Sequence, residues 1–395
     1  MKIGIITLSK GENYGGMLQN FAVMKAYNNL GHEAVTIHDS TTRGIRITHD
    51  RQSTASKLRP SYILAVVKVR LKTKYHIKNQ RDRLIPSIIR KRKNTRIYAD
   101  AKAKRTAAFK TFYDYHIAHT DFDINNDAIP EEKLRDFDFF SVGSDQVWNP
   151  TYPSTSGVKF LSFAESFKKI SFAPSFGISE LPPYTKSHYT KWLSDFPMLS
   201  VREQRGAQII KELTGKEAQV ICDPTLTVTK EQWTEIESNP DFSTDKPYAL
   251  TYFLGNESNR YRRYIEKVAK EKGLDIINLF DLREHKYYSA GPAEFIYLIH
   301  HADAIFTDSF HAAVFSIIFK RDFVVFDRIE DGQTMGSRLK TLLQTYNLED
   351  RMYAKMCTHT FTPADFSETD NIIKSEREKA LDFIRRSIVH NLNIK

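Results

Sequence analysis

Cysteine is scarce in this sequence, which has only Cys222 and Cys357 among 395 residues. Two thiols cannot build a disulfide framework or a four-thiolate zinc site, so a disulfide-rich secreted protein is excluded and a reducing compartment is favoured. No run of 18 apolar residues occurs, and the first residues show neither a basic leader nor a small-residue cleavage site. We therefore expect a cytoplasmic protein.

Sequence motifs for metals and nucleotides are also missing. The chain has no HExxH or CxxC spacing, no GxGxxG and no Gly-Lys-Ser/Thr after a glycine-rich loop. Asp121-Phe-Asp123 and Asp136-Phe-Asp138 match the short Asp-x-Asp pattern of metal-dependent sugar transferases. A three-residue match arises easily by chance in an acidic stretch, so we expect no bound metal and no resident cofactor.

The composition is that of a globular protein. Hydrophobic residues make up 41% of the chain and aromatic residues 12%, which is enough to fill buried interiors and excludes a disordered chain. A length of 395 residues favours two cores rather than one.

Positive charge is concentrated in one arm of the sequence. Residues 41–110 hold 21 Lys and Arg against three acidic residues, while the rest of the chain has more acids than bases. An apolar stretch at residues 62–67 is flanked by basic residues. This pattern favours binding to an anionic membrane surface or to a phosphorylated substrate. A solvated helical hairpin with an apolar seam explains the pattern equally well. Nucleic acid is not expected, because the arm lacks regularly spaced aromatic residues.

Strand-like and helix-like stretches alternate along the chain. Residues 2–8, 17–27 and 34–38 read as strand, helix and strand, which is a βαβ opening. Within the basic arm, residues 62–78 and 95–117 read as helices. After the arm the alternation resumes, and Asp223-Pro224 ends a strand that covers residues 218–222. A second alternating block covers residues 248–346 and includes a helix at 292–300 and a strand at 304–307. We predict an α/β protein with two doubly wound, Rossmann-like domains that face each other across a cleft. The predicted parts are an N-terminal domain (1–235) with a basic helical insertion (about 41–118), a C-terminal domain (246–350) and a helical tail (360–395).

Polar clusters follow the predicted strands, where such folds keep their ligands. The loop at residues 11–16 is rich in glycine and is interpreted either as an anion-binding loop or as a plain turn. The segment 143–150 combines hydrogen-bonding side chains with Trp148. This combination is typical of sugar-binding sites. A capped turn with Trp148 in the core would look the same in sequence.

Two further clusters offer cationic groups. Arg202 directly follows a predicted strand, and its planar guanidinium can bind a carboxylate or a phosphate. The alternative is an ion pair with Glu203 at the surface. Ser309 is placed to cap a helix whose positive N-terminus suits a phosphate. His311 is placed for proton transfer near neutral pH, although a single histidine is often structural.

Six motifs together resemble the polysaccharide pyruvyl transferase family, in the same order and over roughly residues 1–345. They are Asn13-Tyr-Gly-Gly-Met-Leu-Gln19, Gly143-Ser-Asp-Gln-Val-Trp-Asn-Pro150, Ser175-Phe-Gly177, Ser200-Val-Arg-Glu203, Asp223-Pro-Thr-Leu226 and Ser309-Phe-His311. The resemblance implies a GT-B-like arrangement with the acceptor on the N-terminal side and the donor on the C-terminal side. It also implies transfer of the pyruvyl skeleton of phosphoenolpyruvate to two sugar hydroxyls in cell-surface or capsular polysaccharide biosynthesis, giving a cyclic ketal and phosphate.

The resemblance also assigns roles to residues. It implies His311 as the acid and Asp145 as the base, with Arg202, Ser309 and His311 binding the donor. The expected acceptor-binding residues are Asn13, Tyr14, Gly15, Ser144, Asp145, Gln146 and Trp148. No cofactor is implied beyond phosphoenolpyruvate as substrate. The basic arm (41–110) suggests that the saccharide is linked to a lipid diphosphate, which would place the protein at the inner face of the membrane.

One departure from the family pattern concerns the donor. Where this chain has Ser309-Phe310-His311, characterised members have a sequence similar to Arg-Leu-His. A donor-binding arginine is therefore missing from this position. Arg205, Arg338 or a residue of the basic arm is expected to replace it, unless the donor differs. A GT-B glycosyltransferase with a nucleotide-sugar donor and a catalytically inactive glycan-binding partner stay open as alternatives. The sequence leaves the oligomeric state open.

Overall fold

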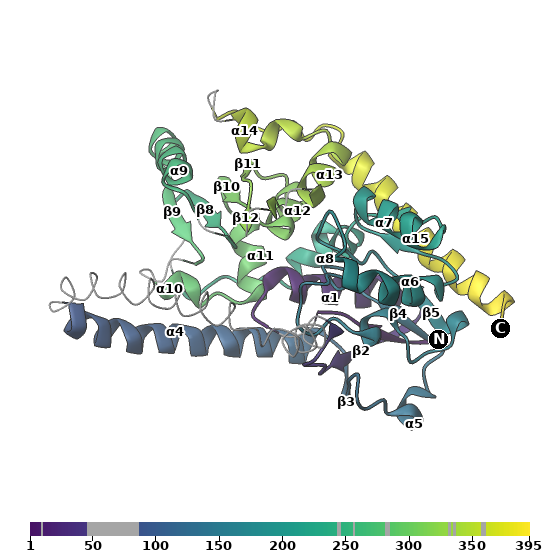
Figure 1. Cartoon of the computed structure of the whole chain (residues 1–395). Helices are drawn as coiled ribbons and strands as arrows, with labels where there is room; N and C mark the ends of the chain where they lie inside the picture. The colour runs from purple at the N-terminus through teal and green to yellow at the C-terminus, as the bar shows by residue number, and fades with distance from the viewer. Residues whose placement is uncertain are drawn as a thin grey trace, which may run out of the picture.

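Two parallel sheets form the framework of the chain in the computed structural model (Figure 1). The structure describes residues 1–8, 11–45, 87–242, 246–255, 257–280, 285–330, 333–334, 337–356 and 361–395. The first sheet has the strand order β3-β2-β1-β4-β5, which matches the first five positions of the Rossmann order 3-2-1-4-5-6. Its strands are β1 (Lys2–Ile6), β2 (Glu33–Asp39), β3 (His119–Ile124), β4 (Phe139–Val142) and β5 (Lys169–Ser171).

The second sheet has the order β11-β10-β8-β9, again with all neighbours parallel. Its strands are β8 (Tyr248–Tyr252), β9 (Asp275–Asn278), β10 (Ala304–Thr307) and β11 (Phe323–Val325). Two small pairs complete the strands: parallel β6 (Ser200–Val201) with β7 (Gln219–Val220), and antiparallel β12 (Ile329–Glu330) with β13 (Gln333–Thr334).

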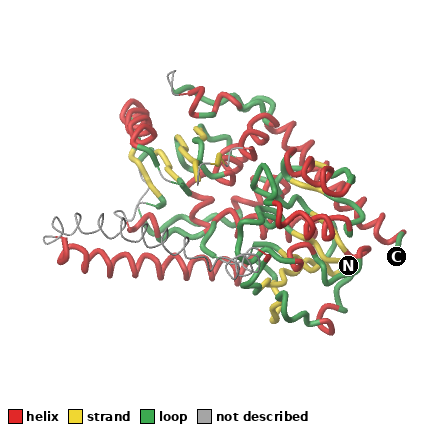
Figure 2. Tube along the Cα trace, in the orientation of Figure 1, coloured by secondary structure: helices red, strands yellow, loops and turns green. Residues whose placement is uncertain are grey.

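Helices cover both sheets (Figure 2). Those of the first half are α1 (Tyr14–Asn29), α4 (Ser87–His116), α5 (Glu131–Leu134), α6 (Lys186–Ser194), α7 (Gln204–Thr214) and α8 (Lys230–Thr234). The second half contributes α9 (Asn259–Lys272), α10 (His285–Tyr288), α11 (Pro292–His300), α12 (Phe310–Ile318), α13 (Ser337–Thr345), α14 (Tyr353–Met356) and α15 (Thr369–Asn393). Short 3-10 turns are η1 (Gly157–Phe160), η2 (Ser166–Lys168), η3 (Pro183–Thr185), η4 (Pro224–Thr227) and η5 (Glu349–Arg351).

One hydrophobic core runs across both halves of the molecule. Tyr14 on α1 stacks on Phe295 of α11, with ring centroids 4.3 Å apart. Trp233 of α8 contacts Phe21 on α1 and Phe315 on α12. Aromatic burial of this kind dominates packing energy, so the two sheets are held as one packed unit.

The C-terminal helix α15 links the two halves from outside. It follows the second sheet in sequence but packs on η4 and β5 of the first half. Arg377 on α15 donates to the carbonyl of Leu226, and Asn391 Nδ2 donates to the carbonyl of Lys169 at 3.0 Å. Figure 1 shows α15 as the yellow helix along one side of the molecule.

The predicted fold class, α/β with two Rossmann-like domains in a GT-B-like arrangement, is confirmed by these two facing parallel sheets. Strand β3 was not predicted, because its outward side chains are polar. It forms the edge of the first sheet, where the unpaired side faces solvent and alternate residues are exposed. Asp121 and Asp123 therefore belong to an edge strand.

The basic arm is described only in part. Helix α4 begins at Ser87 and extends the helix that was predicted over residues 95–117. The other predicted helix, over residues 62–78, lies outside the described residues. Among the helices that are described, none is both long and apolar enough to cross a membrane.

Candidate functional site

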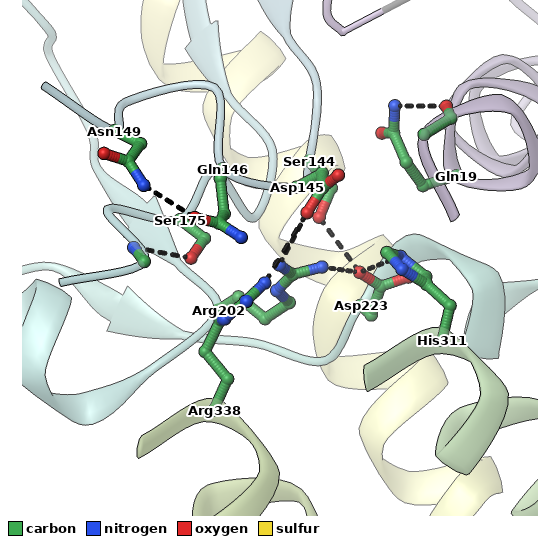
Figure 3. A network of polar contacts seen from close by, with 12 residues as sticks. Gln19, Ser144, Asp145, Gln146, Asn149, Ser175, Arg202, Asp223, His311 and Arg338 are labelled. Atoms are coloured by element: carbon green, nitrogen blue, oxygen red, sulfur yellow. Dashed lines mark hydrogen bonds and ion pairs between the residues drawn. The ribbon is translucent and has the colours of Figure 1, made fainter. Parts of the chain in front are cut away.

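The candidate site lies where both halves of the chain meet (Figure 3). Arg202 follows β6 and Asp223 follows β7, in the first half. His311 is in the first turn of α12, in the second half. All three side chains are buried, and the carboxylate of Asp223 lies between the other two.

Asp223 is the centre of the polar network. Its Oδ1 accepts from Thr225 N at 3.0 Å and from Thr225 Oγ1 at 2.6 Å, which caps η4 and fixes the carboxylate. Its Oδ2 pairs with Arg202 Nη1 and lies 3.1 Å from Ser144 Oγ. The same oxygen lies 3.6 Å from His311 Nε2. One carboxylate thus holds groups from both halves.

Asp145 is held in an uncommon backbone conformation. Its φ of +64° lies in the left-handed region, which few residues other than glycine adopt and which often marks functional sites. Its Oδ1 lies 3.2 Å from Arg202 Nη2 and 3.6 Å from Arg338 Nη1. The strained turn therefore aims a carboxylate at two guanidinium groups.

The two arginines flank one aromatic ring. Phe310 lies 4.4 Å from the guanidinium carbon of Arg202 and 5.9 Å from that of Arg338, measured to the ring centroid. Arg202 and Arg338 also line a small cavity of about 40 Å³ together with Phe310 and Asp223. Figure 3 shows Arg338 extending from its helix toward Asp145. The Arg338 guanidinium thus reaches the network from a further element, α13.

Two helix N-termini converge on His311. Ser309 Oγ accepts from Ala312 N at 3.5 Å and caps α12, as predicted. Gly15, in the first turn of α1, packs so closely on the imidazole that a Cβ there would overlap it. Helix N-termini carry partial positive charge, so these two ends reinforce the cationic character of the site.

Electrostatics keep both carboxylates ionised. Burial alone would raise the pKa of Asp223, but Arg202 and His311 hold that pKa well below its usual range. Burial likewise opposes ionisation of Asp145, whose pKa is nevertheless lowered by His311, Arg202 and Arg338. Burial would also lower the pKa of Arg202, and the two carboxylates raise it above its ordinary value. The site is a charge-balanced network rather than a single ion pair.

Two buried donors in this network have no hydrogen-bond partner within the described residues. They are Arg202 Nε and His311 Nε2. Most buried polar groups in proteins are paired, so such groups call for an explanation. Both side chains contact the same carboxylate oxygen, Asp223 Oδ2, so the two nitrogens belong to one network.

Most of the residues predicted for donor binding and catalysis come together. Arg202, His311 and Asp145 share the network described above, and Ser309 caps the helix that carries His311. The alternative pairing of Arg202 with its neighbour is wrong. Glu203 instead accepts from Ser175 Oγ and Phe176 N, each at 3.0 Å.

The residues predicted to bind the acceptor differ in their burial and in their hydrogen-bond partners. Ser144 Oγ lies 2.9 Å from the carbonyl of Ala173 as well as near Asp223, so it can donate to one of them at a time. Asn13 is exposed and caps α1 through its side chain. Gln146 is buried, and its Oε1 accepts from Asn149 at 2.6 Å.

Tyr14 and Trp148 do not face a ligand, which corrects the prediction for both. Trp148 is 0% exposed, stacks on Phe160 with centroids 5.1 Å apart, and donates from Nε1 to the carbonyl of Lys159. Tyr14 is equally buried in the core between the two halves, and its hydroxyl donates to the carbonyl of Ala290. Both rings have their polar atoms satisfied by the protein, so neither offers a face to a sugar.

Sequence reasoning missed the role of Asp223. The Asp-Pro pair was read as the end of a strand, although an aspartate just past a strand was itself a signal. Gln19 was also missed: its Nε2 donates to Thr7 Oγ1 and to the carbonyl of Gly16, and its buried Oε1 has no partner in the described part of the chain. Its position in the motif that begins at Asn13 could have identified it.

A surface groove of about 440 Å³ lies between α4 and the edge strand β3. Met17, Phe109 and Tyr113 provide an apolar lining. His38 and Asp123 add groups that bind hydroxyls. Aromatic surface combined with such polar groups is suited to sugars.

The groove is linked to the site along the chain. Glu12 lines the groove and is held by Arg105 and Thr106 of α4. Gly15, which packs on His311, follows Glu12 by three residues. Three residues span at most about 10 Å, so Glu12 lies within about that distance of Gly15.

Comparison with known proteins identifies one family. The sequence model of the polysaccharide pyruvyl transferases matches residues 13–329. No curated protein matches the chain in sequence.

Several solved structures show a distant likeness. UDP-GlcNAc 2-epimerase from Neisseria meningitidis, bound to UDP-GlcNAc, is 10% identical with a TM-score of 0.39, covering 96% of this chain and 100% of that one. A putative UDP-N-acetylglucosamine 2-epimerase from Listeria monocytogenes is 9% identical with a TM-score of 0.42, covering 96% and 97%. The glycotransferase of kitacinnamycin is 10% identical with a TM-score of 0.40, covering 98% of both chains. Likeness at this level carries no argument about donor or acceptor.

Proposed function

We propose that this chain, which belongs to the polysaccharide pyruvyl transferase family, transfers the pyruvyl group of phosphoenolpyruvate to two hydroxyls of a saccharide. Two C–O bonds form at C2 of the donor, and the bond from C2 to the phosphate oxygen breaks. The two sugar hydroxyls lose one proton each. The methylene carbon of the donor gains one proton and becomes a methyl group, and the released phosphate takes up the other. The products are a cyclic ketal and inorganic phosphate.

The observation that carries this proposal is the buried pair Arg202 and His311: within the described residues their Nε and Nε2 atoms make no hydrogen bond, and His311 Nε2 faces Asp223 at 3.6 Å. They come from opposite halves and meet at Asp223. The donor has a carboxylate and a phosphate, which need charged hydrogen bonds. The capped N-terminus of α12 adds partial positive charge beside His311.

Roles for the reacting groups follow from this placement. His311 would protonate the methylene carbon, and Asp145 would accept a hydroxyl proton. A cation-like centre at C2 would be stabilised by Asp223, which stays ionised because of Arg202 and His311. These are proposed roles for side chains that the fold brings together.

The direct experiment is incubation with phosphoenolpyruvate and candidate glycans. We expect phosphate release that depends on the glycan, together with a pyruvate ketal on the product. A thermal-shift comparison with nucleoside diphosphates tests the alternative glycosyltransferase, because a ligand of the native state raises its melting temperature. Stabilisation by nucleoside diphosphates but not by phosphoenolpyruvate would replace the proposal with that alternative. Glycan binding without turnover would support an inactive binding partner instead.

Arg338 is proposed as the substitute for the arginine that the family carries two residues before this histidine, where this chain has Ser309. It is buried, reaches Asp145 and lies over the ring of Phe310. Arg205, the other candidate, pairs with Glu212 on the surface. A charged hydrogen bond is worth about 1.5–3 kcal/mol, so Arg338→Met should raise the KM for phosphoenolpyruvate about 10- to 100-fold.

Steady-state kinetics with each substrate varied in turn will check the role of Arg338. The matched control is Arg205→Met, which should leave both KM values within about twofold because surface ion pairs contribute little. If Arg338→Met changes the KM for the saccharide and leaves that for the donor unaltered, Arg338 belongs to the acceptor side.

The saccharide acceptor is proposed to lie in the groove beside α4. Tyr113 contributes aromatic surface there, and its pKa is raised to about 12 by burial and by nearby aspartates, so it stays a neutral ring. Stacking on such a ring contributes about 0.5–1.5 kcal/mol. Tyr113→Ala should therefore raise the KM for the saccharide about two- to tenfold without changing that for the donor.

Tyr115 provides the control for this prediction. It lies on the same helix but is 83% exposed, away from the groove lining. Tyr115→Ala should leave both KM values unchanged. Equal effects of the two substitutions would mean that the groove does not hold the acceptor. A lipid-diphosphate-linked acceptor at a membrane remains a proposal based on the basic arm, to be tested by comparing lipid-linked and free saccharides.

A further inference from the structure

Three potential metal ligands cluster outside the candidate site. They are Glu237, which follows α8, and His300 and His301 at the end of α11. Their ligand atoms all lie within 4.8 Å of one another. We propose that this cluster binds a divalent transition-metal ion, with Zn²⁺ as the ion that its nitrogen and oxygen ligands fit best.

The distances between ligand atoms suit one tetrahedral ion. Zn–N and Zn–O bonds are about 2.0–2.2 Å, which places neighbouring ligand atoms of a tetrahedron roughly 3.3–3.5 Å apart. Glu237 Oε2 lies 2.9 Å from His300 Nδ1, and Glu237 Oε1 lies 3.5 Å from His301 Nε2. Small adjustments of these side chains would place all three around one centre.

Hydrogen bonding explains only one of the two contacts that Glu237 makes with the histidines. The 2.9 Å contact with His300 is a good hydrogen bond, whereas the 3.5 Å contact with His301 is longer than the usual range. Each carboxylate oxygen of Glu237 nevertheless faces a different imidazole nitrogen. A shared cation would satisfy both contacts at once.

The two imidazole rings are held in orientation by aromatic neighbours. His300 stacks on Phe319 with centroids 4.3 Å apart, and His301 stacks on Tyr297 at 4.1 Å. Rings that are already oriented lose less conformational freedom on binding, which favours affinity.

The cluster is accessible to an incoming ion. The His301 side chain is 42% exposed, while His300 and Glu237 are 15% and 12% exposed. One side of the cluster is therefore open, so water can complete a four-coordinate shell around three protein ligands. The remaining sides are enclosed by the end of α11 and the segment after α8.

A metal ion here would join the segment between the two sheets to the C-terminal half. That segment already contacts α11, because Ser238 N donates to the carbonyl of Ala293 at 3.2 Å. A metal bridge from Glu237 to the end of the same helix would fix the segment at a second point. The expected role is structural, and it is independent of the proposed transfer reaction.

The test is metal titration of the full chain without a polyhistidine tag. Zn²⁺ binding by calorimetry should be strong and of one ion per chain, and Co²⁺ should give the visible absorption of a four-coordinate site. Outer-shell changes cost about 10- to 100-fold in metal affinity, so loss of a direct ligand should cost at least about tenfold. We expect that loss for Glu237→Gln and for His301→Asn.

Matched controls separate this site from general metal binding. Glu235→Gln changes an exposed carboxylate two residues away, and His390→Asn changes an exposed histidine on α15. Both should bind Zn²⁺ like the natural chain. Equal affinity of the natural chain and Glu237→Gln would overturn the proposal, and so would the absence of the Co²⁺ absorption, which needs no variant. Circular dichroism without metal shows whether each variant folds.

Discussion

Turnover should fall about 100- to 10,000-fold when His311 is replaced by glutamine, because general acid–base catalysis contributes about that much. Glutamine keeps an amide close to the position of the imidazole but cannot deliver a proton at neutral pH. The geometry supports this role, since His311 Nε2 is buried without a hydrogen-bond partner in the described residues and lies 3.6 Å from Asp223. Phosphate release and ketal formation measure the effect.

The matched control for His311 is an exposed histidine. His390→Gln, on the outer helix α15, should keep full activity. The His311→Gln chain should retain its melting temperature to within a few degrees, which separates catalysis from folding. Full activity of the folded His311→Gln protein would remove this residue from the mechanism and leave Asp145 without a partner acid.

The Asp223→Asn variant should lose about 3–5 kcal/mol of unfolding free energy. This is the usual cost of removing one partner of a buried ion pair, since the other charge is left uncompensated. Arg202 would keep only Asp145 as a carboxylate partner within the network, and His311 would lose the group that it faces. Urea unfolding measures the change directly.

A surface pair gives the comparison for Asp223. Asp114 pairs with Lys110 on α4 where both side chains are solvent-exposed. Asp114→Asn should cost less than about 1 kcal/mol. Similar costs for the two substitutions would show that the Asp223 network does not stabilise the junction of the two halves.

The same carboxylates make stability depend on acid pH. The folded pKa values of Asp223 and Asp145 are lowered, so the folded state binds fewer protons than the unfolded state in acid. Their contribution is complete above the unfolded value near 3.9 and is lost as the pH falls below it toward the lower folded values. The acid loss of stability should therefore be smaller in Asp223→Asn.

Local patterns were sufficient to predict the regular elements. The predicted ranges 292–300 and 304–307 match α11 and β10, because both are continuous apolar segments bounded by clear stop signals. The polar edge strand β3 was not predicted, because its outward side chains face solvent and its few inward side chains give no clear apolar pattern. Pattern alone also could not decide whether Trp148 lines a ligand site or the core.

Residue type and position after a strand identified Arg202, Asp145 and His311, because parallel sheets gather such positions at one edge. The sequence by itself therefore determined the fold class, the location of excess charge and the side chains able to do chemistry. Only the tertiary structure decided which of them meet. Contacts such as Asp223 with His311, Arg338 with Asp145 and Glu237 with His301 join residues distant in the chain, and such pairings depend on how two sheets pack across a shared core rather than on any local preference.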